Sequence, residues 1–192
     1  GETKCRFRQA NAGAAGVTKW AGSTGRTPPN SFRGIDVAMD EITISELQAG
    51  MAAGRFGARD LVEHYLQRIA QVDRQGPTLQ SVLETNPDAL AIAATLDEER
   101  RAGRVRGPLH GIPVLIKDNI DTGDRMKTSA GSLALADGSA PNDAGVAAAL
   151  RVAGAVILGK TNLPVLAGDG QTDNPIFGRT NNPWNLGCGP GG

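Results

Sequence analysis

The sequence has 192 residues, enough for one large domain or for part of a larger protein. Its 20 basic and 20 acidic side chains cancel, so the composition favours neither a nucleic acid nor an anionic membrane as partner. Every apolar run is shorter than the roughly 20 residues that a membrane helix needs.

Cysteine and histidine are scarce. Cys5 and Cys188 lie near opposite ends of the chain and do not suggest a disulfide framework. With only His64 and His110 besides, a Cys/His metal site has few ligands. We therefore predict a reduced protein without a metal or cofactor, in which Cys188 is a free thiol and His110 a turn residue.

Residues 1–40 are rich in Ala, Gly, Ser, Thr and Pro and show no sustained hydrophobic period. Six basic and three acidic side chains make this stretch positively charged. It buries too little apolar surface to offset the entropy of ordering, so we predict a disordered leader, linker or expression artefact. If a leader was removed the protein is exported; otherwise we expect it in the cytoplasm.

Three helices are predicted next, over residues 43–54, 61–76 and 86–103. Thr43 and Glu46 have capping-box spacing, and Asn86-Pro87 supply a cap and a first-turn proline. The second helix carries one apolar stripe, formed by Leu61, Val62, Tyr65, Leu66, Ile69 and Val72. His64 lies beside that stripe, and we interpret it as a surface or boundary residue.

Short apolar runs bounded by glycine follow from residue 107. Residues 112–116 and 155–158 predict buried strands, and residues 79–83 a further strand. An Ala-rich helix over 143–153 ends at Gly154, a typical C-cap residue. This alternation predicts an α/β fold with a largely covered sheet, followed by loop from residue 164 onward.

The segment Gly154–Thr161 formally matches a phosphate-binding loop, G-x-x-x-x-G-K-T. In such a loop the intervening residues form a flexible cradle of backbone N–H groups after a strand. Here they are Ala-Val-Ile-Leu, which predict the strand itself. We therefore reject nucleotide binding at this segment.

Lys117 is the best candidate for chemistry. It directly follows the apolar strand 112–116, and functional groups of α/β sheets gather at the carboxyl ends of strands. A lysine desolvated there would have a lowered pKa and could act as a base. Spacing alone favours the simpler interpretation, a charged residue that marks where the strand leaves the core and pairs with Asp118.

A loop of small and hydroxyl residues, Thr128-Ser129-Ala130-Gly131-Ser132, follows. Such residues usually serve turns. Near a candidate base they could also line a pocket, so we take Ser129 and Ser132 as candidate substrate-binding residues.

Together these segments resemble the amidase signature family. The match is specific over Gly107–Asn119, and the later segments follow in the family's order: Thr128–Ser132, Gly154–Asn162, Asn174–Gly178 and Asn182–Trp184. The resemblance covers residues 41–192, which we treat as the N-terminal portion of an amidase domain. It implies an α/β/α sandwich with a mixed central sheet, truncated here.

The resemblance implies that Lys117 is the catalytic lysine of a triad with a serine in a cis peptide and a nucleophilic serine. Neutral Lys117 would draw a proton through the bridging serine, and an acyl-enzyme would form and be hydrolysed. Backbone N–H groups of a glycine-rich turn would stabilise the oxyanion, and Gly191 and Gly192 are candidates for substrate binding there. No cofactor is implied.

The family's two serines lie beyond the point that matches Pro190-Gly191-Gly192, and Ser129 and Ser132 do not replace them. Three functions stay open: a hydrolase of small-molecule amides, an amidotransferase A-type subunit that acts on charged tRNA, and a non-catalytic fragment. We expect a small amide as substrate, no nucleic acid and no membrane, and a homodimer is compatible with the sequence. We also expect an unpaired strand edge and an uncovered apolar face.

Overall fold

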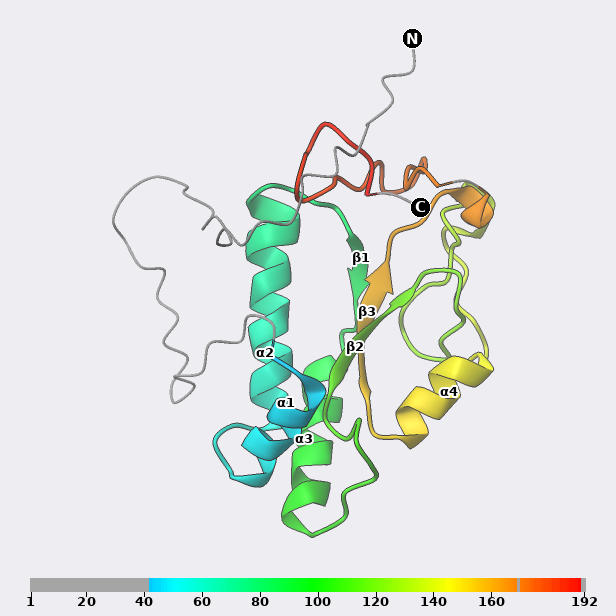
Figure 1. Ribbon diagram of the computed structural model, residues 1–192. Helices are drawn as coiled ribbons and strands as arrows, with labels where there is room; N and C mark the ends of the chain where they lie inside the picture. The colour runs from blue at the N-terminus through cyan, green and yellow to red at the C-terminus, as the bar shows by residue number, and fades with distance from the viewer. Residues whose placement is uncertain (1–41, 169, 191–192) are drawn as a thin grey trace, which may run out of the picture.

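The computed structural model describes residues 42–168 and 170–190 (Figure 1). Residues 1–40, Gly191 and Gly192 lie outside the described residues, so the predictions made for them stay predictions. The principal elements are α1 (Ile44–Ala52), α2 (Ala58–Arg68), β1 (Val82–Thr85), α3 (Ala89–Arg101), β2 (Pro113–Lys117), α4 (Gly145–Val152) and β3 (Val156–Thr161). A π-helical segment, Ile69–Gln75, continues α2, and two 3-10 turns occupy Leu133–Leu135 and Val165–Ala167.

The three strands form a mixed sheet in the order β1-β3-β2. The central strand β3 runs parallel to β2 and antiparallel to β1. Helices α1, α2 and α3 lie on one face of the sheet, and α4 lies on the other (Figure 1). The predicted α/β fold with a mixed central sheet is therefore confirmed.

Alternating side chains of β3 fill two separate cores. Val156 and Leu158 pack among the helices α1–α3, where Leu61 and Val62 of the predicted stripe are fully buried. Ile157 points to the other face and packs with Ile116 under α4. This period of two is the geometry of a strand that is covered on both faces.

Local signals determine the ends of the first helix as predicted. Thr43 N–H donates to the Glu46 carboxylate over 2.8 Å, and Glu46 N–H donates back to Thr43 Oγ1 over 3.2 Å. These bonds are the reciprocal pair of a capping box. Gly54 follows the helix at a φ of +66°, a left-handed conformation that favours glycine.

Several boundaries differ from the predictions, and for two of them the hydrogen bonding gives the reason. The third helix begins at Ala89 rather than at Pro87, because the side chain of Asn86 makes other hydrogen bonds than those of a helix cap. Its Oδ1 accepts a bond from Asp88 N–H over 2.9 Å, and its Nδ2 donates to Ile157 O over 2.9 Å. Strand β1 begins at Val82, later than the predicted 79–83, because its partner residues in β3 start opposite Val82.

Cys188 is disulfide-bonded, so the predicted free thiol was wrong.

The loop predicted from residue 164 is confirmed over the described residues 164–168 and 170–190, which contain only a short 3-10 turn and one isolated bridge. Across the same described chain, no helix combines the length and the apolar character that crossing a membrane would require.

Candidate active site at the carboxyl ends of β2 and β3

Lys117 is the last residue of β2, opposite Thr161, the last residue of β3. The two strands are parallel, so their carboxyl ends lie at the same end of the sheet. The predicted position of Lys117 at the carboxyl end of a strand is confirmed. The side chain of Lys117 is exposed, and the expected desolvation is therefore wrong for the described residues. The physical reason is that β2 is an edge strand of the described sheet, so one side of Lys117 is uncovered.

The residue after Lys117 fixes the next loop. Asp118 is buried, and its N–H donates to Thr161 O over 3.1 Å, which extends the strand pairing. Its Oδ2 accepts bonds from Ser129 Oγ over 2.5 Å and from Ser129 N–H over 3.2 Å. The carboxylate of Asp118 thus binds the hydroxyl loop, where the sequence had left a pairing with Lys117 open.

The structure brings Ser129 next to the Lys117 segment and holds it there. Ser129 is buried, and its Oγ also accepts a bond from Gly131 N–H over 3.2 Å. The intervening Ala130 and Gly131 have φ values of +48° and +68°, so the loop turns sharply at this point. Ser132 is half-buried directly after this turn. A substrate-binding role of either serine stays a prediction.

A buried polar network, which sequence reasoning missed, ties the later loop to this edge. Asn174 Nδ2 donates to Asn162 Oδ1 over 2.7 Å and to Leu163 O over 2.8 Å. Asn162 Nδ2 donates to Thr180 Oγ1 over 2.9 Å. The signal in the sequence was that Asn162 and Asn174 belong to two of the segments that carry the family resemblance. The network ties the later loop, at Asn174 and Thr180, to the carboxyl end of β3.

A cavity of about 270 Å³ lies beside these loops. Asp118 and Ser129 contribute to its wall, whereas Lys117 does not. The remaining lining residues are Leu83, Glu84, Lys127, Ala136, Ile176 and Phe177. The cavity combines apolar walls with a few polar groups, a composition typical of small-molecule sites.

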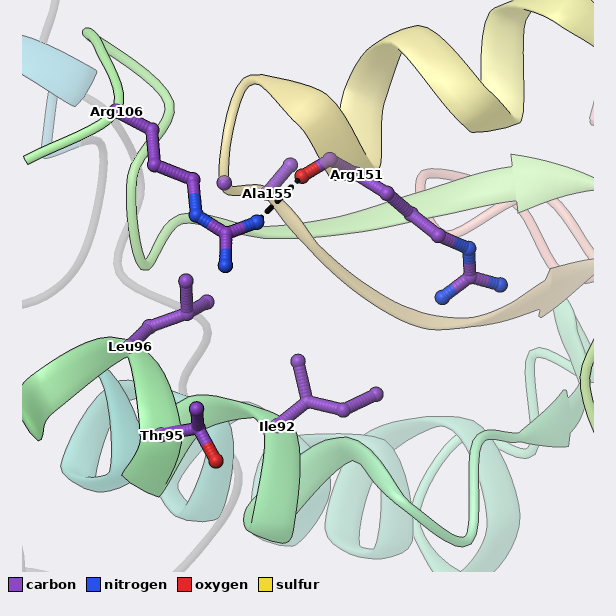
Figure 2. A pocket seen from close by; sticks show the side chains of 7 residues that line it. Ile92, Thr95, Leu96, Arg106, Arg151 and Ala155 are labelled. Carbon is purple, nitrogen blue, oxygen red and sulfur yellow. Dashed lines mark hydrogen bonds between the residues drawn. The ribbon is translucent and has the colours of Figure 1, made fainter. Parts of the chain in front are cut away.

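A second cavity, of about 250 Å³, lies at the opposite ends of the strands (Figure 2). Its lining includes Ala155, which precedes β3, and the side chains of Ile92 and Leu96 of α3 (Figure 2). Arg106 on its rim donates to Arg151 O over 3.1 Å and to Glu99 over 2.7 Å. No site residue predicted from the sequence contributes to this wall.

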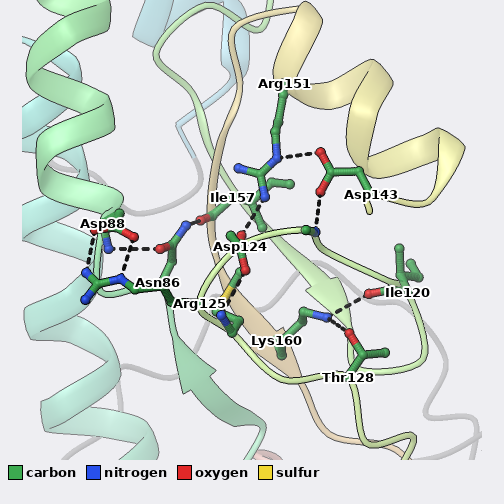
Figure 3. Close-up of polar contacts among 12 residues, drawn as sticks. Asn86, Asp88, Ile120, Asp124, Arg125, Thr128, Asp143, Arg151, Ile157 and Lys160 are labelled. Atoms are coloured by element: carbon green, nitrogen blue, oxygen red, sulfur yellow. Dashed lines mark hydrogen bonds and ion pairs between the residues drawn. The ribbon is translucent and has the colours of Figure 1, made fainter. Parts of the chain in front are cut away.

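The segment that resembles a phosphate loop is strand β3, as we had concluded from its apolar residues. Lys160 within it is fully buried and faces the loop that follows Lys117 (Figure 3). His110 lies in a turn, as predicted, and is buried with Nε2 at 2.9 Å from Leu96 O. Among residues 42–168 and 170–190, no group of three or more His, Cys, Asp or Glu side chains could hold a metal.

Comparisons with known proteins identify the family and agree with the fold. The profile of the family named Amidase matches residues 60–192. The chain is 49% identical to the peptide amidase of Stenotrophomonas maltophilia, with a TM-score of 0.75 over 80% of this chain and 32% of that one. It is 30% identical to a bacterial aryl acylamidase, with a TM-score of 0.69 over 79% of this chain and 31% of that one.

The chain is also 41% identical over 154 residues to the A-type subunit of the glutamyl-tRNA(Gln) amidotransferase of Alkaliphilus metalliredigens, covering 80% of this chain and 31% of the relative. The family profile and the solved relatives therefore show an α/β fold of the amidase class, and the chain belongs to the amidase signature family. The chain spans 31% and 32% of the length of the amidotransferase subunit and of the peptide amidase. It spans 27% of the length of a putative amidase of Schizosaccharomyces pombe.

Proposed function

We propose that this chain supplies the lysine of an enzyme that hydrolyses linear amides to a carboxylate and ammonia or an amine. The observation that carries the proposal is the position of Lys117 at the carboxyl end of β2. There it lies beside Thr161 of β3 and directly before Asp118, which holds the hydroxyl loop. Membership of the amidase signature family supports the same assignment.

In the proposed reaction the neutral amine of Lys117 accepts a proton through a bridging serine from a nucleophilic serine. The nucleophile attacks the amide carbonyl, the amine leaves with a proton, and water hydrolyses the acyl-enzyme. The resemblance assigns neither serine to a residue of the 192-residue sequence. We therefore expect this chain alone to release no ammonia from amides, in agreement with the fragment hypothesis.

The cavity beside Asp118 and Ser129 supports a small amide as substrate, and peptide amides and aryl acylamides are the first compounds to test. The names of the two solved relatives suggest these two classes. The second candidate function is that of an amidotransferase A-type subunit, which the 41% identity to such a protein supports. The balanced charge of the chain favours the free-standing hydrolase.

A chimera tests the proposal directly. Residues 43–190 would replace the corresponding segment of the Stenotrophomonas maltophilia peptide amidase, and release of ammonia from peptide amides would be measured. We expect the chimera to be active and Lys117→Ala to abolish turnover. The control is Arg55→Ala, which removes an exposed basic side chain between α1 and α2 and should leave turnover unchanged.

Full activity of the chimera that carries Lys117→Ala would contradict the assignment of Lys117 as the catalytic lysine. Ammonia release from the 192-residue chain alone that depends on Lys117 would contradict the expected inactivity. If ammonia were released only with charged tRNA and a second subunit, the amidotransferase function would replace the hydrolase.

A further inference from the structure

The buried lysine of β3 is unusual in its surroundings. Lys160 is the largest fully buried side chain among residues 42–168 and 170–190. In the sheet it lies opposite Ile116 of β2 and Glu84 of β1, so its backbone is held on both sides. Its backbone therefore lies in the central strand, one residue before the end of β3.

The ammonium of Lys160 binds both ends of the loop that follows Lys117 (Figure 3). Its Nζ donates to Ile120 O over 2.7 Å and to Thr128 Oγ1 over 2.9 Å. Ile120 N–H in turn donates to Lys117 O over 3.0 Å, which closes the turn at the strand end. Thr128 directly precedes Ser129, the hydrogen-bond partner of Asp118. One cation thus joins the start of the loop to its end.

The middle of the same loop is held from outside by α4 (Figure 3). Arg151 binds the carboxylates of Asp124 and Asp143, the latter over 2.9 Å, and Gly123 N–H donates to Asp143 over 2.8 Å. These contacts fix where the loop lies on the helix. They do not touch the turn 117–120. That turn is held by the pairing of Asp118 N–H with Thr161 O and, through Ile120 O, by the side chain of Lys160.

Burial of a cation is costly, and a hydrophobic side chain of similar volume is often as good for stability. Burial lowers the pKa of Lys160, although the carboxylates of Asp118, Asp124, Asp121 and Glu84 act in the opposite direction. A lysine at this position is therefore poorly explained by stability alone. Its two directed hydrogen bonds are what an apolar residue could not supply.

We propose that Lys160 is a positioning residue, which fixes the turn 117–120 and the Ser129 end of the loop so that the Lys117 amine is held in place. Only the expected effect on the reaction rests on the proposed catalytic role of Lys117. The expected effect of Lys160 on the geometry of the loop does not depend on that role.

The test compares Lys160→Met with Lys127→Met in the 192-residue chain. Methionine keeps the volume of Lys160 and removes its donors, while Lys127 lies exposed on the same loop. Amide hydrogen exchange would be followed at Asp118 and Ile120, with Leu96 of α3 as the internal reference. The rate at which acetic anhydride modifies the Lys117 amine would be measured by mass spectrometry.

We expect Lys160→Met to accelerate exchange at Asp118 and Ile120 about tenfold or more, the effect of losing a hydrogen bond to a charged group. Exchange at Leu96 should stay unchanged, and the modification rate of Lys117 should change with the loop. Lys127→Met should alter none of these. If Lys160→Met does not fold, Thr128→Val removes one acceptor only and should produce a smaller change of the same kind.

Unchanged exchange at Asp118 and Ile120 would overturn the proposal. Equal acceleration of all amides with an unchanged Lys117 modification rate would also overturn it, because Lys160 would then serve general stability. In the active chimera, Lys160→Met should lower kcat about tenfold and leave KM unchanged. If Lys117→Ala leaves the chimera active but Lys160→Met still changes Lys117 modification, the catalytic assignment fails and the positioning role stands.

Discussion

The hydroxyl of Ser129 donates a 2.5 Å hydrogen bond to the carboxylate of Asp118, and this contact joins the residue after Lys117 to the hydroxyl loop. Both side chains are buried, so the bond is made away from water. The carboxylate also receives the Ser129 N–H, and the hydroxyl receives the Gly131 N–H. The contact therefore links the end of β2 to a loop eleven residues further along the chain.

Removing the Ser129 hydroxyl should lower the stability of the chain. Ser129→Ala deprives the buried Asp118 carboxylate of its shortest hydrogen bond, so we expect the free energy of unfolding to fall by about 1.5–3 kcal/mol. Urea unfolding measures the loss. Ser139→Ala, an exposed serine on the same segment, is the control and should change stability by less than about 0.5 kcal/mol. Equal effects of the two substitutions would show that the contact is energetically unimportant.

A side chain at Gly159 should disrupt the pairing of β1 with β3. A Cβ there would overlap the carbonyl oxygen of Glu84 and approach Thr85 Cα to 3.2 Å. We expect Gly159→Ala to lower the free energy of unfolding by about 1–3 kcal/mol, the usual cost of overpacking. The matched control is Gly145→Ala at the start of α4, where a Cβ meets no atom within 4 Å.

The Gly145→Ala control should be neutral or stabilise the chain by up to about 1 kcal/mol, because alanine destabilises a helix less than glycine does. A chemical denaturation series on both variants checks the pair. A stable Gly159→Ala variant would mean that the β1–β3 register can shift without cost.

The stability that Lys160 contributes should depend on pH. Burial lowers the pKa of Lys160, so this side chain binds a proton less readily in the folded than in the unfolded chain. The stability of the wild type relative to Lys160→Met should therefore rise with pH, from the lowered pKa of Lys160 up to the unfolded value of about 10.4. Below that window the difference should be constant.

Lys127 provides a control of opposite sign. A hydrogen bond from its ammonium to Asp137 raises the pKa of Lys127, so any stability that it contributes is present below the unfolded pKa and lost as pH rises through the folded value. Urea unfolding of the wild type, Lys160→Met and Lys127→Met at several alkaline pH values tests both signs. If the free energies of unfolding of the wild type and Lys160→Met change with pH in parallel between the lowered pKa of Lys160 and about 10.4, the sign predicted for Lys160 is contradicted.

Elements with strong local signals were predictable from the sequence. The capping box of Thr43 and Glu46 and the left-handed glycines Gly54 and Gly154 are determined by residues close together in the chain. The position of Lys117 at a strand end followed from the apolar run before it. Its exposure did not, because that depends on which strand lies at the edge of the sheet.

The groups that hold the site together act across long separations. Lys160 reaches Ile120 and Thr128 over 40 and 32 residues, and Asn162 binds Thr180 over 18 residues. A hydrophobic pattern predicts which face of a strand is buried, but not which polar side chain lies beneath that face. The predicted strand 155–158 stopped short of Lys160 for the same reason, because only pairing with Ile116 and Glu84 shows that the strand continues.

The central place of β3 also determines when the sheet can form during synthesis. Among the described residues β1 and β2 do not pair with each other, and both pair with β3, which comes last in the chain. A nascent chain that has not yet extended past Thr161 can pack α2 against α3, but its described residues, from 42 onward, include no strand on which β1 and β2 can assemble. Sheet formation must also close long loops, which slows folding. The segment that holds Lys117 therefore acquires its geometry only after the ribosome has completed β3.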